Sequence, residues 1–246
     1  MHFHVICGVE PDAVVAGSTR IVSRLAFLPL LVLFCAVGLG AIAHAQETTA
    51  RQATPEEAMA FFRQQNKKVL TFVGYSEAAY QDRAAMLLQA ERILAGFDPA
   101  KTIVNIGGTP DGIGAVYEVA KRRGFTTTGI VSSQAKRHEV PLSSHVDRVF
   151  YIEDESWGGF LEGSERLSPT SQAMLAASDV IVGIGGGEVA RDEMVAAKRA
   201  GKEVRFIPAD MNHEKAREIA RKKGVAAPTD FRGAADPVFR DSMSRP

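Results

Sequence analysis

The chain has 246 residues, 29 Lys and Arg against 29 Asp and Glu, and a formal net charge of zero. Proteins that bind a nucleic-acid polyanion normally carry a marked basic excess, so this balance argues against a nucleic-acid partner. A chain of this length is long enough to bury one hydrophobic core of ordinary size.

The N-terminal segment has the pattern of an export signal. An uncharged apolar run covers residues 25–43, Arg20 and Arg24 precede it, and Ala43-His44-Ala45 ends it. This order of positive, apolar and small residues is typical of a signal peptide and predicts cleavage after Ala45. The alternative is a retained membrane anchor, because a run of this length nearly spans a bilayer.

Cleavage would decide both the location and the chemistry of the mature chain. We expect a signal peptide at 1–45 and a periplasmic or secreted protein, with membrane contact only through an uncleaved signal. Cys7 and Cys35 would be lost, which leaves no thiol for a disulfide or a metal site. His138, His145 and His213 lack the spacing of metal ligands, so we expect no metal, and we expect no resident cofactor.

The remainder divides into an N-terminal lead and helix at 46–66, a main domain at 67–224 and a C-terminal tail at 225–246. Residues 46–53 are small and polar, and we expect them to be disordered. Thr54, followed by Pro55 and Glu57, predicts a capped helix start. The tail is rich in Ala, Pro and Arg, which predicts a loose or surface-wrapping segment.

Short apolar runs alternate with amphipathic segments throughout the main domain. The predicted strands are 69–73, 102–106, 127–131, 148–152, 180–184 and 204–207. Helices are predicted near 77–94, 113–120, 171–177 and 188–200. Near-continuous apolar strands separated by helices favour a parallel sheet covered on both faces. The predicted fold class is therefore α/β, a three-layer Rossmann-like open parallel sheet with helices on both faces.

Three glycine-rich turns follow predicted strands. In open α/β sheets, ligands bind beyond the carboxyl ends of the strands, where helix N-termini present free N–H groups. Converging turns would form an anion site from backbone alone; otherwise each glycine only supplies positive φ at a turn. The predicted ligand-binding residues are Gly74, Tyr75, Ser76, Gly107, Gly108, Thr109, Asp111, Gly112, Gly114, Gly185, Gly186, Gly187 and Glu188.

The second and third turns resemble motifs of the Lonely Guy family of nucleotide phosphoribohydrolases and of the wider SLOG class of Rossmann-like nucleotide-binding domains. The first family motif corresponds to residues 107–116, continuing to Gly124 and to 129–131. The second, P-G-G-x-G-T-x-x-E, corresponds to residues 185–193. The resemblance covers most of 69–208. It implies a nucleotide-like small-molecule ligand and pairing into a homodimer.

The resemblance also implies a catalytic role for Glu193, the final acid of the second motif. In the family's reaction this acid supports the ribosyl cation as the N-glycosidic bond breaks. Here, however, Val189 and Ala190 replace the motif Gly and Thr, and Thr170 and Ser171 stand where the family carries an Arg-Lys pair. These departures favour binding without turnover, and an N-glycosidic hydrolase using Glu193 is the alternative.

Two further enzyme classes are left open by single features. Residues 183–188 are close to a dinucleotide fingerprint and Asp210 follows the next strand, as in a dinucleotide-dependent oxidoreductase. Ser76 lies in a sequence close to a nucleophile elbow, and His213 is the base that an esterase would need. Trp157 lies in a long insert, either as a lid over a bound ring, as a partner contact or as an anchor of its loop.

Overall fold

The computed structural model describes residues 48–240, which belong to one compact unit. The predicted signal segment and its cleavage site lie outside the described residues, as do the last residues of the tail. The unit is built on a parallel sheet. Its strands are β1 (Thr49–Ala53), β2 (Lys68–Gly74), β3 (Thr102–Ile106), β4 (Thr126–Ser132), β5 (Arg148–Ile152), β6 (Val180–Ile184) and β7 (Glu203–Ile207).

The seven strands lie in the order β1-β5-β4-β3-β2-β6-β7, and every pairing is parallel. The chain runs outward from β2 to β5 and then returns to place β6 on the other side of β2. The sheet therefore has a topological switch point between β2 and β6, the place where open α/β sheets bind ligands.

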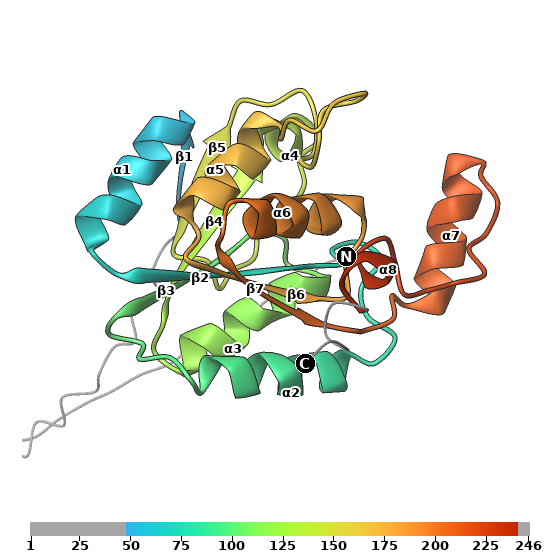
Figure 1. The fold of residues 1–246 in the computed structure, drawn as a ribbon, viewed down its shortest axis with the longest axis horizontal. Helices are drawn as coiled ribbons and strands as arrows, with labels where there is room; N and C mark the ends of the chain where they lie inside the picture. The colour runs from blue at the N-terminus through green and yellow to red at the C-terminus, as the bar shows by residue number, and fades with distance from the viewer. Residues whose placement is uncertain (1–47, 241–246) are drawn as a thin grey trace, which may run out of the picture. The chain divides into compact units, whose positions relative to one another are not determined.

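Helices cover both faces of this sheet (Figure 1). On one face lie α2 (Arg83–Leu94) and α3 (Val116–Arg122), and on the other lie α1 (Pro55–Gln65), α5 (Pro169–Ala177) and α6 (Glu188–Arg199). The predicted three-layer Rossmann-like class is confirmed. The short elements are η1 (Gly112–Ala115), α4 (Ser133–Arg137), α7 (His213–Lys223) and α8 (Asp236–Phe239).

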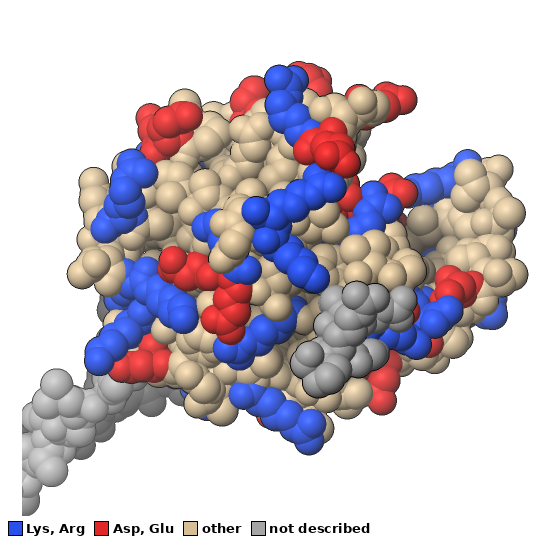
Figure 2. Space-filling view, viewed as in Figure 1, with Lys and Arg blue, Asp and Glu red and all other residues tan. Residues whose placement is uncertain are grey.

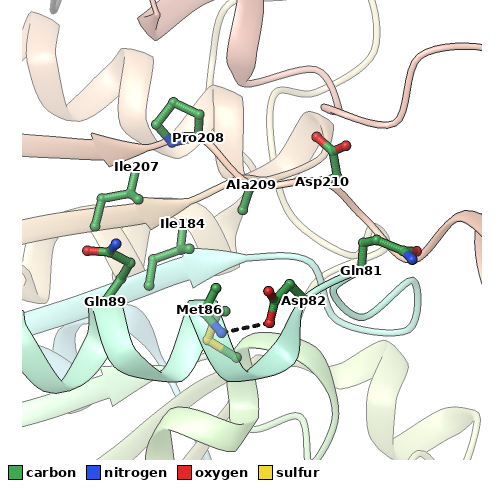
Figure 3. Close-up of a pocket in the computed structure, with 10 residues that line it drawn as sticks. Gln81, Asp82, Met86, Gln89, Ile184, Ile207, Pro208, Ala209 and Asp210 are labelled. Atoms are coloured by element: carbon green, nitrogen blue, oxygen red, sulfur yellow. Dashed lines mark hydrogen bonds between the residues drawn. The ribbon is translucent and has the colours of Figure 1, made fainter.

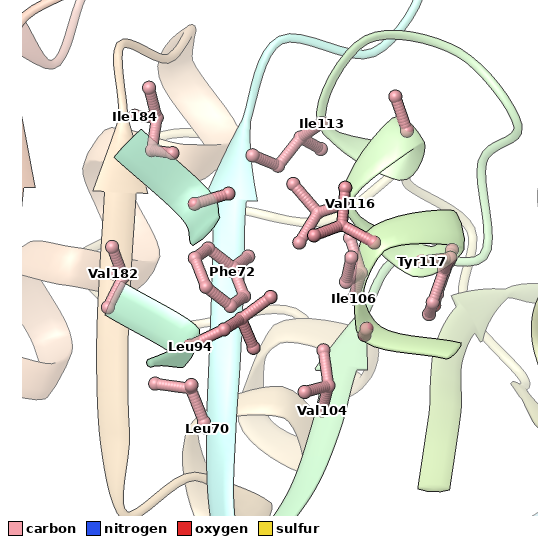
Figure 4. Packing of buried hydrophobic residues seen from close by; sticks show 14 of the residues in the cluster. Leu70, Phe72, Leu94, Val104, Ile106, Ile113, Val116, Tyr117, Val182 and Ile184 are labelled. Atoms are coloured by element: carbon pink, nitrogen blue, oxygen red, sulfur yellow. The ribbon is translucent and has the colours of Figure 1, made fainter. Parts of the chain in front are cut away.

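Alternation along β2 divides the core into two layers. Leu70 and Phe72 point to the α2 and α3 face, where they pack with Leu94 and Val116 (Figure 4). Val69 points to the other face and packs against residues of α1 and α5. Fully burying a side chain of this size contributes roughly 1.5–3 kcal/mol, so both faces hold their helices by apolar contact.

Two sequence predictions need correction. Residues 49–53, expected to be disordered, form edge strand β1, which pairs with β5 across five residues. The helix expected near 77–94 begins only at Arg83, with Asp82 as its cap. Ala79 adopts a positive φ of 51°, and the buried Tyr80 forms a bridge with Met211. These long-range contacts override the local helical pattern.

Local signals elsewhere agree with the structure. Thr54 and Glu57 form the predicted capping box at the start of α1. The helix α7 is rich in Lys and Arg, and its residues are mostly exposed. Basic and acidic side chains are interspersed over the face shown in Figure 2. Within residues 48–240, none of the helices has the length and apolar content to cross a membrane.

Candidate functional site

The three predicted glycine turns lie together at the carboxyl edge of the sheet. β2 pairs with β3 on one side and with β6 on the other, so the turns that follow these strands are neighbours. The contacts confirm this: Ile113 N–H donates to the Tyr75 carbonyl at 2.7 Å. A Cβ added to Gly186 would lie 3.7 Å from Gly74 Cα. The topology therefore brings the predicted ligand-binding residues to one edge.

The turn after β3 is open to solvent at its first glycine. Gly107 is exposed, and a Cβ added there would meet nothing within 4 Å. Gly108, by contrast, is buried, and its N–H donates to the Tyr117 hydroxyl at 3.1 Å. That hydroxyl in turn donates to the Thr128 carbonyl at 2.8 Å. The tyrosine fixes the base of this turn and leaves Gly107 facing outward.

The turn after β6 is filled by the protein's own groups. The Tyr75 ring lies across it, so a Cβ on Gly185 would come within 2.5 Å of the ring. The Tyr75 hydroxyl lies 2.5 Å from the Arg232 carbonyl and 3.0 Å from that of Ala209. Burial raises the pKa of Tyr75 to about 12, opposed by a hydrogen bond from Gly186, so the hydroxyl is neutral at physiological pH.

Residues 231–239, here termed the C-terminal segment, close this turn from outside. Ala235 N–H donates to the Gly186 carbonyl at 3.1 Å, and a Cβ on Gly233 would lie 2.5 Å from the same oxygen. Ala235 and Phe239 are buried beside α6 and β7. This described part of the tail therefore lies on the surface of the domain, which is one of the two predicted forms, and Figure 1 shows α8 beside the end of the sheet.

The turn after β2 is held by a second tyrosine. Tyr80 is buried, its hydroxyl donates to the Ile184 carbonyl at 2.7 Å, and it accepts the Tyr75 N–H at 3.3 Å. Ser76 is exposed. Gly112 has a φ of +58°, and a Cβ there would lie 2.1 Å from the Tyr75 carbonyl, so this position requires glycine.

The predicted ligand-binding residues thus fall into two groups. Some are packed against the chain itself, namely Tyr75, Gly108, Gly114, Gly185 and Gly186, all of which are buried. Those that are exposed or half-exposed are Gly74, Ser76, Gly107, Thr109, Asp111, Gly112, Gly187 and Glu188. Gly187 resembles Gly107, since a Cβ added there would also meet nothing within 4 Å. Gly187 caps α6 without a side-chain hydrogen bond.

Glu193 lies inside the protein and not at the edge. Its side chain is buried, and Ser171 Oγ donates to Glu193 Oε1 at 2.7 Å. Burial raises the pKa of Glu193 to about 7; the Ser171 hydrogen bond opposes this shift and the nearby Asp192 adds to it. Ser171 also accepts the Gly159 N–H at 2.8 Å, so the loop after β5 covers this carboxyl.

The loop after β5 borders a cavity of about 540 Å³ beside the first turn of α6. Glu188, Val189, Arg191 and Asp192 of α6 line one side of it. Asp192 is buried, pairs with Arg191 at 2.8 Å and accepts the N–H of Phe160 at 2.9 Å. Glu193 does not line this cavity, although it is the next residue of the helix.

Trp157 lies in the same loop, before Gly159, and is 54% exposed. Its ring stacks on His138, with centroids 5.6 Å apart. Asp154 anchors the loop through the N–H groups of Ser156 and Thr170. Burial favours the neutral form of Asp154, but these hydrogen bonds hold its pKa below the ordinary value.

Asp210 is the residue that an oxidoreductase would use, and Ser76 and His213 are the pair that an esterase would use. Asp210 follows β7 and lies 3.5 Å from His213 Nε2. His213 stacks on Phe231, with ring centroids 4.0 Å apart. Within residues 48–240, no hydrogen bond joins the side chains of Ser76 and His213; His213 Nε2 faces Asp210 instead. The described residues also contain no group of three or more His, Cys, Asp or Glu arranged to hold a metal.

The chain matches no family model and no curated protein. Among solved structures, the protein TM1055 is 23% identical to this chain, with a TM-score of 0.41. The match covers 56% of this chain and 72% of TM1055. A Moco carrier protein from Chlamydomonas reinhardtii is 20% identical, with a TM-score of 0.42, and the match covers 73% of this chain and 99% of the carrier protein. The molybdenum cofactor binding protein from Rippkaea orientalis is 17% identical, with a TM-score of 0.45, and the match covers 73% of this chain and 98% of that protein.

The fold is defined by the sheet itself. Its strand order confirms the Rossmann-like fold that the sequence resemblance implies. The chain is thus a Rossmann-like α/β domain in its fold. The ligand remains a prediction from the edge of the sheet.

Several residues that shape this edge were not singled out from the sequence. Tyr80 and Tyr117 were expected only as helix residues, yet their hydroxyls hold two of the turns. Ser171 stands where the Lonely Guy family carries a basic residue, and the structure shows that its hydroxyl contacts Glu193. No sequence signal points to these hydroxyl contacts, because each joins residues from separate elements.

Proposed function

We propose that the protein is exported and binds a nucleotide or a related phosphosugar at the carboxyl edge of its sheet, without turnover. The observation that carries this proposal is the pair of open glycines, Gly107 and Gly187, in the turns that follow the two strands flanking β2. They lie to either side of β2, at the carboxyl edge beside the switch point, where open α/β sheets bind phosphate-bearing ligands.

The electrostatics of this edge suit an anion held by backbone groups. Gly187 stands before α6, whose first N–H groups have no side-chain cap. A helix N-terminus carries a partial positive charge that favours phosphate, so no Lys or Arg is required. Ser76 and Asp111 are exposed beside the open glycines and offer a hydroxyl and a carboxylate to a sugar.

The surroundings of Glu193 support binding without catalysis. A catalytic acid must reach the reacting atoms, whereas this carboxyl is 4% exposed and contacts Ser171 below the loop. One observation favours the alternative, an N-glycosidic hydrolase. A carboxyl with a pKa of about 7 is suited to proton transfer at neutral pH. Opening of the loop would be needed to expose it.

The binding proposal is tested by calorimetric titration of the purified protein with AMP, ribose 5-phosphate, ADP-ribose and NAD, which measures the affinity for each ligand. We expect Gly107→Ala and Gly187→Ala to weaken binding of the phosphorylated ligands roughly tenfold or more, because each methyl group occupies the anion site. Neither substitution meets a neighbouring atom, so the fold should be unchanged.

Gly96→Ala is the matched control, since Gly96 is exposed at the end of α2 and its nearest neighbour lies 3.4 Å from an added Cβ. Equal affinities for all three variants would contradict the proposed site. Chromatography of the same mixtures detects turnover. Release of free base, abolished by Glu193→Gln, would establish the hydrolase in place of the binding protein.

Export is tested separately, by sequencing the N-terminus of the protein recovered from outside the cytoplasm. An N-terminus at Gln46 is the expected result. A full-length chain in the membrane fraction would instead establish a retained anchor.

A further inference from the structure

A second, smaller cavity of about 280 Å³ lies between α2 and the ends of β6 and β7 (Figure 3). Its walls are largely apolar. Ile184, Ile207 and Ala209 come from the strand side, and Ala85 and Met86 come from α2. The accessible side chains of Ala85, Ile207 and Ala209 form apolar surfaces that suit a flat ring.

The polar side chains that line this cavity are neutral or acidic. They are the amides of Gln81 and Gln89 and the carboxylates of Asp82 and Asp210, and the lining contains no Lys or Arg. Figure 3 shows Gln89 on α2, Asp82 at the N-terminal end of α2, and Asp210 just past β7. Two carboxylates repel a phosphate but accept hydrogen bonds from N–H groups, so this cavity favours a ring that bears amino groups.

Its size sets a limit on the occupant. Cavities that enclose a whole drug-sized ligand measure roughly 300–1,000 Å³, and this one is slightly smaller. It therefore accommodates one ring system and not a complete dinucleotide. The rest of any larger ligand must lie outside, along the edge of the sheet.

Its position links it to the glycine turns. Ile184 lines the cavity and is followed directly by Gly185 and the turn after β6. The strands β6 and β7, joined by α6, form a parallel βαβ unit, and Asp210 follows its second strand. In dinucleotide-binding units of this kind, an acid at the end of the second strand lies beside the nucleoside part of the ligand.

We propose that this cavity binds the base of the ligand, a flat nitrogen heterocycle with an exocyclic amino group. The ring packs between Ala85 on α2 and Ala209 on the strand side, Asp210 accepts a hydrogen bond from the amino group, and the Gln89 amide pairs with the ring edge. Carboxylate-to-amino and glutamine-to-adenine pairings of this type are established in base recognition. The identification of the ring as a nucleotide base rests on the proposed function, but ring binding itself is independent of phosphate.

The test uses adenine alone, with unsubstituted purine as the comparison, and measures affinity by ligand-observed NMR titration. Ala85→Phe should fill the cavity and weaken adenine binding roughly tenfold or more. Ala84→Phe is the matched control, because Ala84 is an exposed neighbour on α2 that does not line the cavity. Asp210→Asn should weaken adenine binding roughly tenfold and leave purine binding unchanged, because the charged acceptor is lost.

Failure of adenine to bind, or equal effects of Ala85→Phe and Ala84→Phe, would overturn the cavity as the binding site. Equal responses of adenine and purine to Asp210→Asn would overturn its role as the acceptor. Ribose 5-phosphate, titrated in parallel, separates this proposal from the proposed function. Phosphate binding without adenine binding contradicts only the cavity, whereas adenine binding without phosphate binding contradicts only the glycine site.

Discussion

The turns after β3 and β6 have similar sequences but different surroundings. Both begin with two adjacent glycines at the end of a buried strand, next to β2. After β3, Gly107 faces open space, whereas after β6 the first two glycines lie beneath Tyr75 and the C-terminal segment. Only the third glycine, Gly187, is open there. Each turn therefore combines an open glycine with closely packed ones, but only the turn after β6 is covered by the C-terminal segment.

The difference shows what a glycine motif does and does not establish. A missing side chain allows either a ligand or another part of the chain to approach the backbone. In the turn after β6, the chain itself makes this approach through the carbonyl of Arg232 and the N–H of Ala235. The predictions below test whether the two turns differ in energy as they do in structure.

The largest effect is expected from adding a methyl group to the filled turn. Gly186 has a φ of +138°, and a Cβ there would lie 2.7 Å from Ala190 Cβ. We expect Gly186→Ala to lower the free energy of unfolding by about 3 kcal/mol or more, from backbone strain and overlap together. Gly107→Ala should change it by less than about 0.5 kcal/mol. Urea unfolding of both variants measures the contrast, and equal losses would contradict it.

The next effect concerns the helix that follows the filled turn. Glu193 has a pKa of about 7 in the folded protein, against an ordinary value of 4.5. The folded state therefore binds this proton more tightly, so the free energy of unfolding should fall as the pH rises from 4.5 to about 7 and then level off. The expected loss is about 3 kcal/mol at 1.36 kcal/mol per pKa unit.

Glu193→Gln keeps an acceptor for Ser171 and does not ionise, so the variant should lack this decrease and be more stable than the parent protein at pH 8. Urea unfolding at pH 5 and pH 8 measures both effects. Glu188→Gln, at an exposed position on the same helix, is the control and should follow the parent profile. A parallel decrease in Glu193→Gln would show that another group titrates.

The smallest effect distinguishes the tyrosines of the two turns. Tyr117→Phe removes a fully buried hydroxyl from Gly108 and Thr128 and should lower the free energy of unfolding by about 1–3 kcal/mol. Tyr75→Phe should have a smaller global effect, about 1 kcal/mol, but should release the C-terminal segment, which it holds at Arg232. Trypsin cleavage after Arg232 should then be faster in Tyr75→Phe than in Tyr117→Phe. Equal cleavage rates would show that the segment is held by its other contacts.

Much of the fold follows from short-range patterns in the sequence. The strands 148–152 and 180–184 were predicted at their observed bounds, because uninterrupted apolar runs between turn residues have few other stable conformations. The glycine turns were placed correctly, since each follows a strand of one parallel sheet. Strand β1 was missed because its residues are polar and largely exposed. Its pairing with β5 depends on an edge that exists only after the sheet has formed.

The sequence by itself determined the α/β class, the order of the elements and the edge at which a ligand is expected. It could do so because hydrophobic periodicity and glycine placement act over a few residues. Only the tertiary structure decided which glycines face solvent, that Glu193 is buried on Ser171, and that residues 231–239 cover the turn after β6. Each of these outcomes depends on groups brought together from distant parts of the chain, and their contact energies arise only when the protein is folded.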